Sequence, residues 1–131
     1  MELAADAATA DALIIEPVAA ADWVAQSLSG LTPARAGRFI VHGAHDRAHV
    51  RPNNIGIEIE AALAFGTGHH GTTRGCLLAL DDLAKRLRPR RILDIGTGSG
   101  VLAIAAAKIL RTRAIASDID RIAAAAAKAN A

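Results

Sequence analysis

The stretch RILDIGTGSGVLAIAAAK, residues 91–108, decides the fold of this 131-residue chain. Residues 91–95, with Ile92, Leu93 and Ile95, predict a β-strand, and glycines follow it at positions 96, 98 and 100. Glycine lets the backbone turn sharply and approach a ligand closely, and the next helix directs its first amides into that turn. The stretch therefore predicts a strand, a glycine turn and a helix that bind a nucleoside cofactor.

The spacing of the glycines distinguishes two classes of nucleotide-binding turn. Dinucleotide sites use G-x-G-x-x-G, which would place the third glycine at position 101, where this chain has Val101. Asp118 follows a second predicted strand, residues 113–117, where an acidic side chain accepts hydrogen bonds from ribose hydroxyls. A nicotinamide-dependent oxidoreductase is an alternative that this spacing disfavours. A simpler alternative is that the glycines only make a tight turn and that Asp118, in competition with Ser117 and Asp120, caps the next helix.

Strands and helices alternate on both sides of the glycine turn. Residues 70–87 have the apolar spacing of a helix that ends before Pro89, and Asp120 begins another predicted helix. Residues 38–42 and 55–60 have strand character, and the residues between them predict a loop. Alternation of this kind predicts an α/β fold in which helices flank a parallel sheet.

A second loop rich in glycine and threonine, AFGTGHHGTT at residues 64–73, opens the helix predicted before Pro89. Its exposed amides, hydroxyls and aromatic ring suit the binding of a polar ligand beside an adenine or a methionine tail. Taken by itself, the spacing is equally compatible with a helix-capping loop in which Thr72 or Thr73 is the cap. The loop indicates a ligand site only in combination with the glycine turn at residues 96–100.

Together, AFGTGHHGTT and LDIGTGSGVLAIAAAK resemble the bacterial ribosomal protein L11 methyltransferase family (PrmA-type), over residues 22–131. The Asp22-Trp23 pair and the RFIV strand add to the resemblance. The resemblance implies a Rossmann-like class I methyltransferase fold with S-adenosyl-L-methionine as cofactor. It also implies that lysine and α-amino groups of ribosomal protein L11 of the large subunit are the methyl acceptors. By motif position, it assigns cofactor-binding roles to Thr73, Gly96, Asp118, Gly98 and Phe65.

The same resemblance implies that the chain is an internal fragment of a longer protein. Residues 1–45 would be the remnant of an α+β substrate-recognition domain plus a junction, and residues 46–131 the N-terminal half of a methyltransferase domain. The segment that faces the methyl group in this family follows Asn130, so no catalytic residue is assigned. We therefore expect the fragment itself to be inactive, with a cofactor-binding-only module as the alternative function.

Composition limits the remaining possibilities. A net charge of +2 is too small to predict direct nucleic-acid binding. The single cysteine, Cys76, excludes an intramolecular disulfide and is expected to be a small core residue, and the His69-His70 pair lacks further ligands for a metal. The chain has neither a signal peptide pattern nor the roughly 18 apolar residues of a membrane helix, so we expect a cytoplasmic protein without a membrane partner. Oligomeric state is left open.

Overall fold

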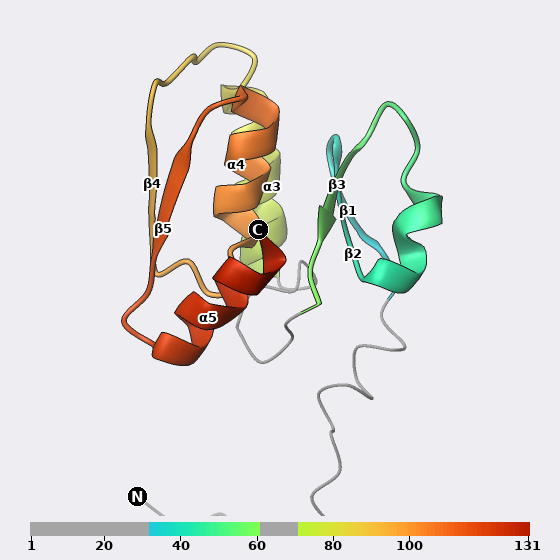
Figure 1. The fold of residues 1–131 in the computed structure, drawn as a ribbon. Helices are drawn as coiled ribbons and strands as arrows, with labels where there is room; N and C mark the ends of the chain where they lie inside the picture. The colour runs from blue at the N-terminus through green and yellow to red at the C-terminus, as the bar shows by residue number, and fades with distance from the viewer. Residues whose placement is uncertain (1–31, 61–70) are drawn as a thin grey trace, which may run out of the picture.

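The computed structural model describes residues 32–60 and 71–131. The predictions for residues 1–31 and for Phe65 lie outside these ranges. Two small sheets stand on opposite sides of a pair of helices (Figure 1), and the helices contact strands of both sheets. The elements are β1 (Ala34–Ala36), β2 (Phe39–His42), the 3-10 helix η1 (Ala44–His49), β3 (Ile55–Glu58), α3 (Gly71–Leu83), β4 (Ile92–Ile95), α4 (Val101–Leu110), β5 (Ala114–Ser117) and α5 (Arg121–Asn130).

The unit β4–α4–β5 confirms the predicted strand, glycine turn and helix and the second strand that follows them. The two strands are parallel, and the register runs from the pair Ile92 and Ala114 to the pair Ile95 and Ser117. A parallel pair needs a crossover connection, and α4 supplies it with an almost wholly apolar sequence, VLAIAAAKIL. The helix ends at Arg111, which adopts the left-handed conformation of a C-terminal cap.

The other sheet contains features that the sequence did not predict. Its first strand, β1, is only three residues long and pairs antiparallel with β2 through a turn at Gly37, where φ is +59°. Strand β2 then pairs in parallel with β3. The prediction of a plain loop between them is wrong, because η1 occupies part of it. Arg47 of η1 holds Glu58 of β3 through two hydrogen bonds of 2.7 and 2.6 Å, a contact that a local pattern does not reveal.

Helix α3 ends four residues earlier than predicted, at Leu83 instead of Leu87. The Arg86 amide donates to the Leu83 carbonyl at 3.0 Å, which tightens the chain into a turn three residues long. The Arg88 guanidinium then donates to the carbonyl oxygens of Ala84 and Leu87 at 2.6 and 2.8 Å. The Arg88 side chain thus provides hydrogen bonds to backbone carbonyl groups at the end of this segment, just before Pro89.

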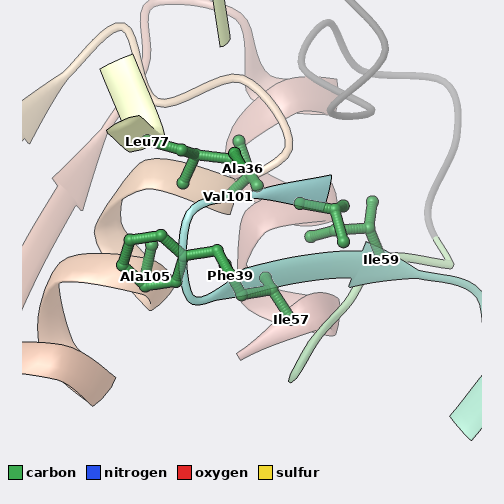
Figure 2. Close-up of a cluster of buried hydrophobic side chains, with 8 residues drawn as sticks. Ala36, Phe39, Ile57, Ile59, Leu77, Val101 and Ala105 are labelled. Atoms are coloured by element: carbon green, nitrogen blue, oxygen red, sulfur yellow. The ribbon is translucent and has the colours of Figure 1, made fainter. Parts of the chain in front are cut away.

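The main hydrophobic core lies between the three-stranded sheet and the two central helices (Figure 2). Phe39 and Ile57 from the sheet, Leu77 from α3 and Ala105 from α4 are all almost completely buried. The core therefore joins residues from both sides of position 45. The division of the chain at that position stays a prediction, since β2 before it and β3 after it belong to one sheet.

The described residues cover only one of the two faces of the second sheet, which consists of β4 and β5. Side chains alternate along β4, and those that point away from α4 are exposed: Leu93 by 62% and Ile95 by 78%, with Ile115 of β5 exposed by 65%. The described residues thus show the α/β arrangement and the parallel strand pair that were predicted. The complete Rossmann-like sheet and a separate recognition domain stay predictions. In residues 32–60 and 71–131, no helix has the length and hydropathy that crossing a membrane requires.

Candidate functional site

The glycine turn between β4 and α4 depends on three backbone conformations that side chains disfavour. Gly96, Gly98 and Gly100 have φ angles of +75°, +56° and +84°, all in the left-handed region. A residue with a Cβ atom pays roughly 1–2 kcal/mol to adopt such a conformation, whereas glycine does not. The G-x-G-x-G spacing predicted from the sequence therefore reflects a turn in which every second residue has a positive φ.

The turn is fastened to the carboxyl end of β5. The amides of Gly96 and Thr97 both donate to the Ser117 carbonyl, at 2.8 and 3.0 Å. On the β4 side, the Thr97 hydroxyl donates to an Asp94 carboxylate oxygen at 2.7 Å. These contacts explain why Asp94 stands two residues before the first glycine: its carboxylate holds the turn, and most of its surface is covered.

The Asp118 carboxylate bridges the glycine turn and the start of α5. Its Oδ2 accepts a hydrogen bond from the Gly98 amide at 2.8 Å, and its Oδ1 accepts one from the Asp120 amide at 3.0 Å. The amides of Asp120 and then of Gly98 lower the pKa of the Asp118 carboxyl below its ordinary value, because they stabilise the ionised form. A carboxylate has about four lone-pair positions, so it can also accept hydrogen bonds from a ligand hydroxyl.

The competing assignment of a helix cap is resolved in favour of Asp120. Asp120 is the N-cap of α5, and its side chain accepts a hydrogen bond from the Ile122 amide at 2.9 Å. Asp118 is therefore not the α5 cap, although it contacts the amide of the capping residue. Its carboxylate is directed at the glycine turn instead.

The turn has the properties of a ligand cradle on one side and of a packed contact on the other. A Cβ atom built on Gly96 would meet no atom of the described residues within 4 Å, so this part of the chain leaves the space beside Gly96 open. A Cβ atom built on Gly100 would lie 3.1 Å from the Cα and Cβ atoms of Ala127 in α5. Helix α4 begins at Gly100 without a side-chain cap, which leaves its first amides available to a polar group.

The predicted cofactor residues are brought together only in part. Gly96, Gly98 and Asp118 form one connected group through the contacts described above. Thr73 lies in the first turn of α3 and is buried, but within the described ranges it makes no hydrogen bond to the glycine turn. Phe65 falls outside the described residues. The expectation that Cys76 is a core residue is wrong for the described part of the chain, because this thiol on α3 is exposed.

One contributor to the site was not predicted. Asn130, the last residue of α5, donates through its side-chain nitrogen to the Ser99 carbonyl at 2.9 Å and accepts through its side-chain oxygen from the Glu60 amide at 3.1 Å. The sequence signal was an asparagine at a helix end, which is common enough to carry no meaning before the partners are known. In the described parts of the chain, no group of three His, Cys, Asp or Glu side chains is arranged to hold a metal ion.

Comparison with known proteins agrees with the geometry of the turn. The family described as "Ribosomal protein L11 methyltransferase (PrmA)" matches residues 2–131. Among curated relatives, ribosomal protein L11 methyltransferase of Rhodopseudomonas palustris (strain BisB5) is 63% identical over 130 residues, which are 99% of this chain and 44% of the relative. The protein of the same name from Bradyrhizobium diazoefficiens is 65% identical over 111 residues, which are 85% of this chain and 38% of the relative.

A third relative, the ribosomal protein L11 methyltransferase of Agrobacterium fabrum (strain C58), is 60% identical over 109 residues, covering 83% of this chain and 37% of that protein. The chain thus spans less than half the length of the curated relatives it matches. The chain belongs to the ribosomal protein L11 methyltransferase family, which confirms the resemblance found in its two glycine-rich motifs.

Proposed function

We propose that the protein carrying this chain transfers methyl groups from S-adenosyl-L-methionine to lysine and α-amino groups of ribosomal protein L11, in the cytoplasm. Membership of the family supports methyl transfer to this substrate. The single observation that carries the cofactor assignment is the bond from the Gly98 amide to the Asp118 carboxylate, because it unites the two motif positions expected to hold the nucleoside.

The residues of this chain would act by binding and orienting the cofactor. The space that the described residues leave open beside Gly96 would let the cofactor approach the backbone of the turn. The ionised Asp118 would accept hydrogen bonds from the ribose hydroxyls of the cofactor. Gly98, Thr73 and Phe65 complete the proposed set. S-adenosyl-L-methionine supplies a methyl group that is activated by attachment to a positively charged sulfur. The chain's task is then to hold this donor in one orientation, since positioning is a large part of such catalysis.

The proposal retains the expected division of labour along the chain. Residues 46–131 would supply half of the methyltransferase domain, and residues 1–45 the end of the part that recognises ribosomal protein L11. A protein limited to these 131 residues is expected to be inactive, because the segment expected to face the methyl group follows Asn130. It is also expected to self-associate, because Leu93, Ile95 and Ile115 present an apolar face to solvent. Light scattering of such a protein, beside a methylation assay, would test both expectations. Monomeric behaviour together with methyl transfer would refute them.

Calorimetric titration of the protein with S-adenosylmethionine, its demethylated product S-adenosylhomocysteine, and NAD provides the sharpest test of the cofactor. We expect both sulfur compounds to bind and NAD to bind more weakly, because Val101 replaces the third glycine of the dinucleotide turn. Tighter binding of NAD would overturn the proposal and favour an oxidoreductase. Binding of S-adenosylmethionine by the full-length protein without methylation of ribosomal protein L11 would favour a cofactor-binding-only module.

A further inference from the structure

The two ends of the β4–β5 sheet carry opposite charges. The acidic residues lie at the carboxyl end, where Asp94 is near the end of β4, and Asp118 and Asp120 follow β5. Residues 83–93 and 95–117 contain no aspartate or glutamate. The amino end of the sheet is basic, because seven of the 15 basic residues of the chain precede one of the two strands: Lys85, Arg86, Arg88, Arg90, Arg91, Arg111 and Arg113.

The parallel arrangement of the strands brings two of these basic segments together. The amino ends of β4 and β5 lie at the same end of the sheet (Figure 1). The Ile92 amide donates to the Arg113 carbonyl at 3.3 Å, and the Thr112 hydroxyl donates to the Arg90 carbonyl at 3.0 Å. Two segments that are distant in the sequence are thus hydrogen-bonded neighbours. Four exposed arginines lie on them, and we call this group the basic edge: Arg90, Arg91, Arg111 and Arg113.

The described residues do not neutralise the basic edge. Lys85 and Arg86 pair with Asp82, at 3.3 and 2.8 Å, but within residues 32–60 and 71–131 the four arginines of the basic edge form no ion pair. The acidic end of the sheet compensates them little, because a strand of four residues spans about 13 Å, whereas physiological salt screens charges over about 8 Å. Like charges on neighbouring segments repel each other, so an anionic partner would stabilise this edge.

The chemistry of arginine favours phosphate as the anion. A planar guanidinium donates two parallel hydrogen bonds to one phosphate group, and it stays charged throughout the physiological pH range. Nucleic acids present phosphates at regular intervals, so that several arginines can be engaged at once. The proposed methyl acceptor is a ribosomal protein, which would bring the enzyme to RNA. In this respect the inference rests on the proposed function.

We propose that the basic edge binds the phosphodiester backbone of RNA without selecting its sequence. The net charge of +2 argues against nucleic acid only for the chain as a whole, because it averages over acidic residues that lie elsewhere. Five of the 13 acidic residues precede residue 32, and three more lie at the opposite end of the same sheet. RNA at the basic edge would leave the glycine turn accessible, so RNA and cofactor should bind independently.

The test measures the affinity of the full-length protein for a short, fluorescently labelled single-stranded RNA of mixed sequence, by fluorescence anisotropy at several salt concentrations. The edge variant combines Arg90→Gln, Arg91→Gln, Arg111→Gln and Arg113→Gln. We expect it to bind RNA about ten-fold more weakly than the parent protein, or weaker still. The slope of log affinity against log salt concentration should become shallower by about 0.7 for each phosphate contact that is lost.

The control variant loses the same amount of charge away from the basic edge. It combines changes at four other exposed basic residues: Arg35→Gln, Arg51→Gln, Arg121→Gln and Lys128→Gln. We expect it to bind RNA nearly as tightly as the parent protein. Polyglutamate added as a competitor distinguishes RNA from an acidic protein as the partner, and we expect it to compete poorly. Competition as strong as that of unlabelled RNA would overturn RNA as the partner.

The affinity for S-adenosylhomocysteine, measured by calorimetry, separates this inference from the proposed function. We expect the parent protein and both variants to bind this compound alike. Failure of the parent protein to bind it would refute the proposed function. A parent protein that does not bind RNA, or equal RNA affinity in the edge and control variants, would overturn the role of the basic edge alone.

Two smaller variants keep the test decisive if the edge variant does not fold. One combines Arg90→Gln with Arg91→Gln, and the other combines Arg111→Gln with Arg113→Gln. Each should weaken RNA binding and make its salt dependence shallower, because each removes charge from one of the two segments. Unchanged RNA affinity in both would overturn the proposal.

Discussion

The two sheets of this chain differ in how completely they are covered. All four residues of β2 are buried, and Phe39 and Ile57 on this sheet have no exposed surface. In the β4–β5 sheet, by contrast, the side chains facing away from α4 are more than half exposed. Parallel strands in α/β proteins are normally covered on both faces. The comparison teaches that the three-stranded sheet carries most of the packing, whereas the second sheet carries the site.

The site depends on backbone conformation and polar contacts as well as on the packing of Gly100 against Ala127. Its shape follows from three glycines with positive φ and from hydrogen bonds of the backbone to Ser117 and Asp118. Local conformation can therefore form the glycine turn even where one face of the sheet is open. Substitutions in the two sheets should then have different consequences, for stability in one and for binding in the other.

Phe39→Ala should produce the largest effect. Removing this fully buried ring from the core cluster should lower the free energy of unfolding by about 3–5 kcal/mol, through lost burial and the cavity left behind. Ile115→Ala on the exposed face is the matched change and should cost under about 0.5 kcal/mol. Chemical denaturation of both variants measures the difference. Equal costs would mean that the two sheets are covered alike.

Asp118→Ala should chiefly affect binding. We expect about 10- to 100-fold weaker binding of S-adenosylhomocysteine, because a charged acceptor for ribose is lost together with the bond to the Gly98 amide. Asp120→Ala is the control, since it removes the cap of α5 and should cost about 1 kcal/mol of stability with little change in affinity. Calorimetry and denaturation on both variants separate these effects. Equal losses of affinity would show that Asp118 is not the ribose contact.

Gly96→Ala isolates the contribution of backbone conformation. The added methyl group would meet no atom of the described residues within 4 Å, so we attribute the expected loss of about 1–2 kcal/mol in unfolding free energy to the φ of +75°. Gly75→Ala, at an exposed helical position of α3 with equally open surroundings, should instead stabilise the protein by about 0.5–1 kcal/mol. Thermal denaturation will show whether the two changes have opposite signs.

The smallest expected effect is on the acid dependence of stability. Because the folded state lowers the pKa of Asp118, its stabilising contribution is complete above the unfolded pKa of about 3.9 and is lost as the pH falls through the lower folded value. Asp118→Asn should therefore reduce the loss of stability in that acidic range. The change will be partial, because the pKa values of Glu58 and Asp82 are also lowered by their basic partners. Urea denaturation at a series of pH values between neutral and acidic measures the unfolding free energy of the parent protein and of Asp118→Asn. If the unfolding free energy falls equally steeply with decreasing pH in both proteins, the assignment is contradicted.

The part of the fold that could be predicted lies where structure depends on neighbouring residues. The bounds of β4 and β5 were predicted to within one residue, because a glycine turn separates a short apolar strand from a long apolar helix. Gly96, Gly98 and Asp118 were identified by the same local spacing. The cofactor-binding roles of all five residues, Thr73 and Phe65 included, stay predictions.

The missed features depend on distant partners. Helix η1 has the polar sequence AHDRAH and no buried residue, and its Arg47 pairs with Glu58, eleven residues later. Strand β1 is too short for a periodic pattern, although Gly37 before Arg38 was a usable sign of a turn. The role of Asn130 required knowledge of backbone groups 31 and 70 residues away. None of these contacts is encoded in a local spacing.

The long reach of Asn130 also sets an order of events during synthesis. The β4–α4–β5 unit closes over a short length of chain and can form once Ser117 has left the ribosome, because local contacts form early. Glu60 has been synthesised long before, but its hydrogen-bond acceptor does not exist until Asn130 has been added. The glycine turn can thus form first, while the hydrogen bonds of Asn130 to Ser99 and Glu60 must wait until the end of α5 has left the ribosome.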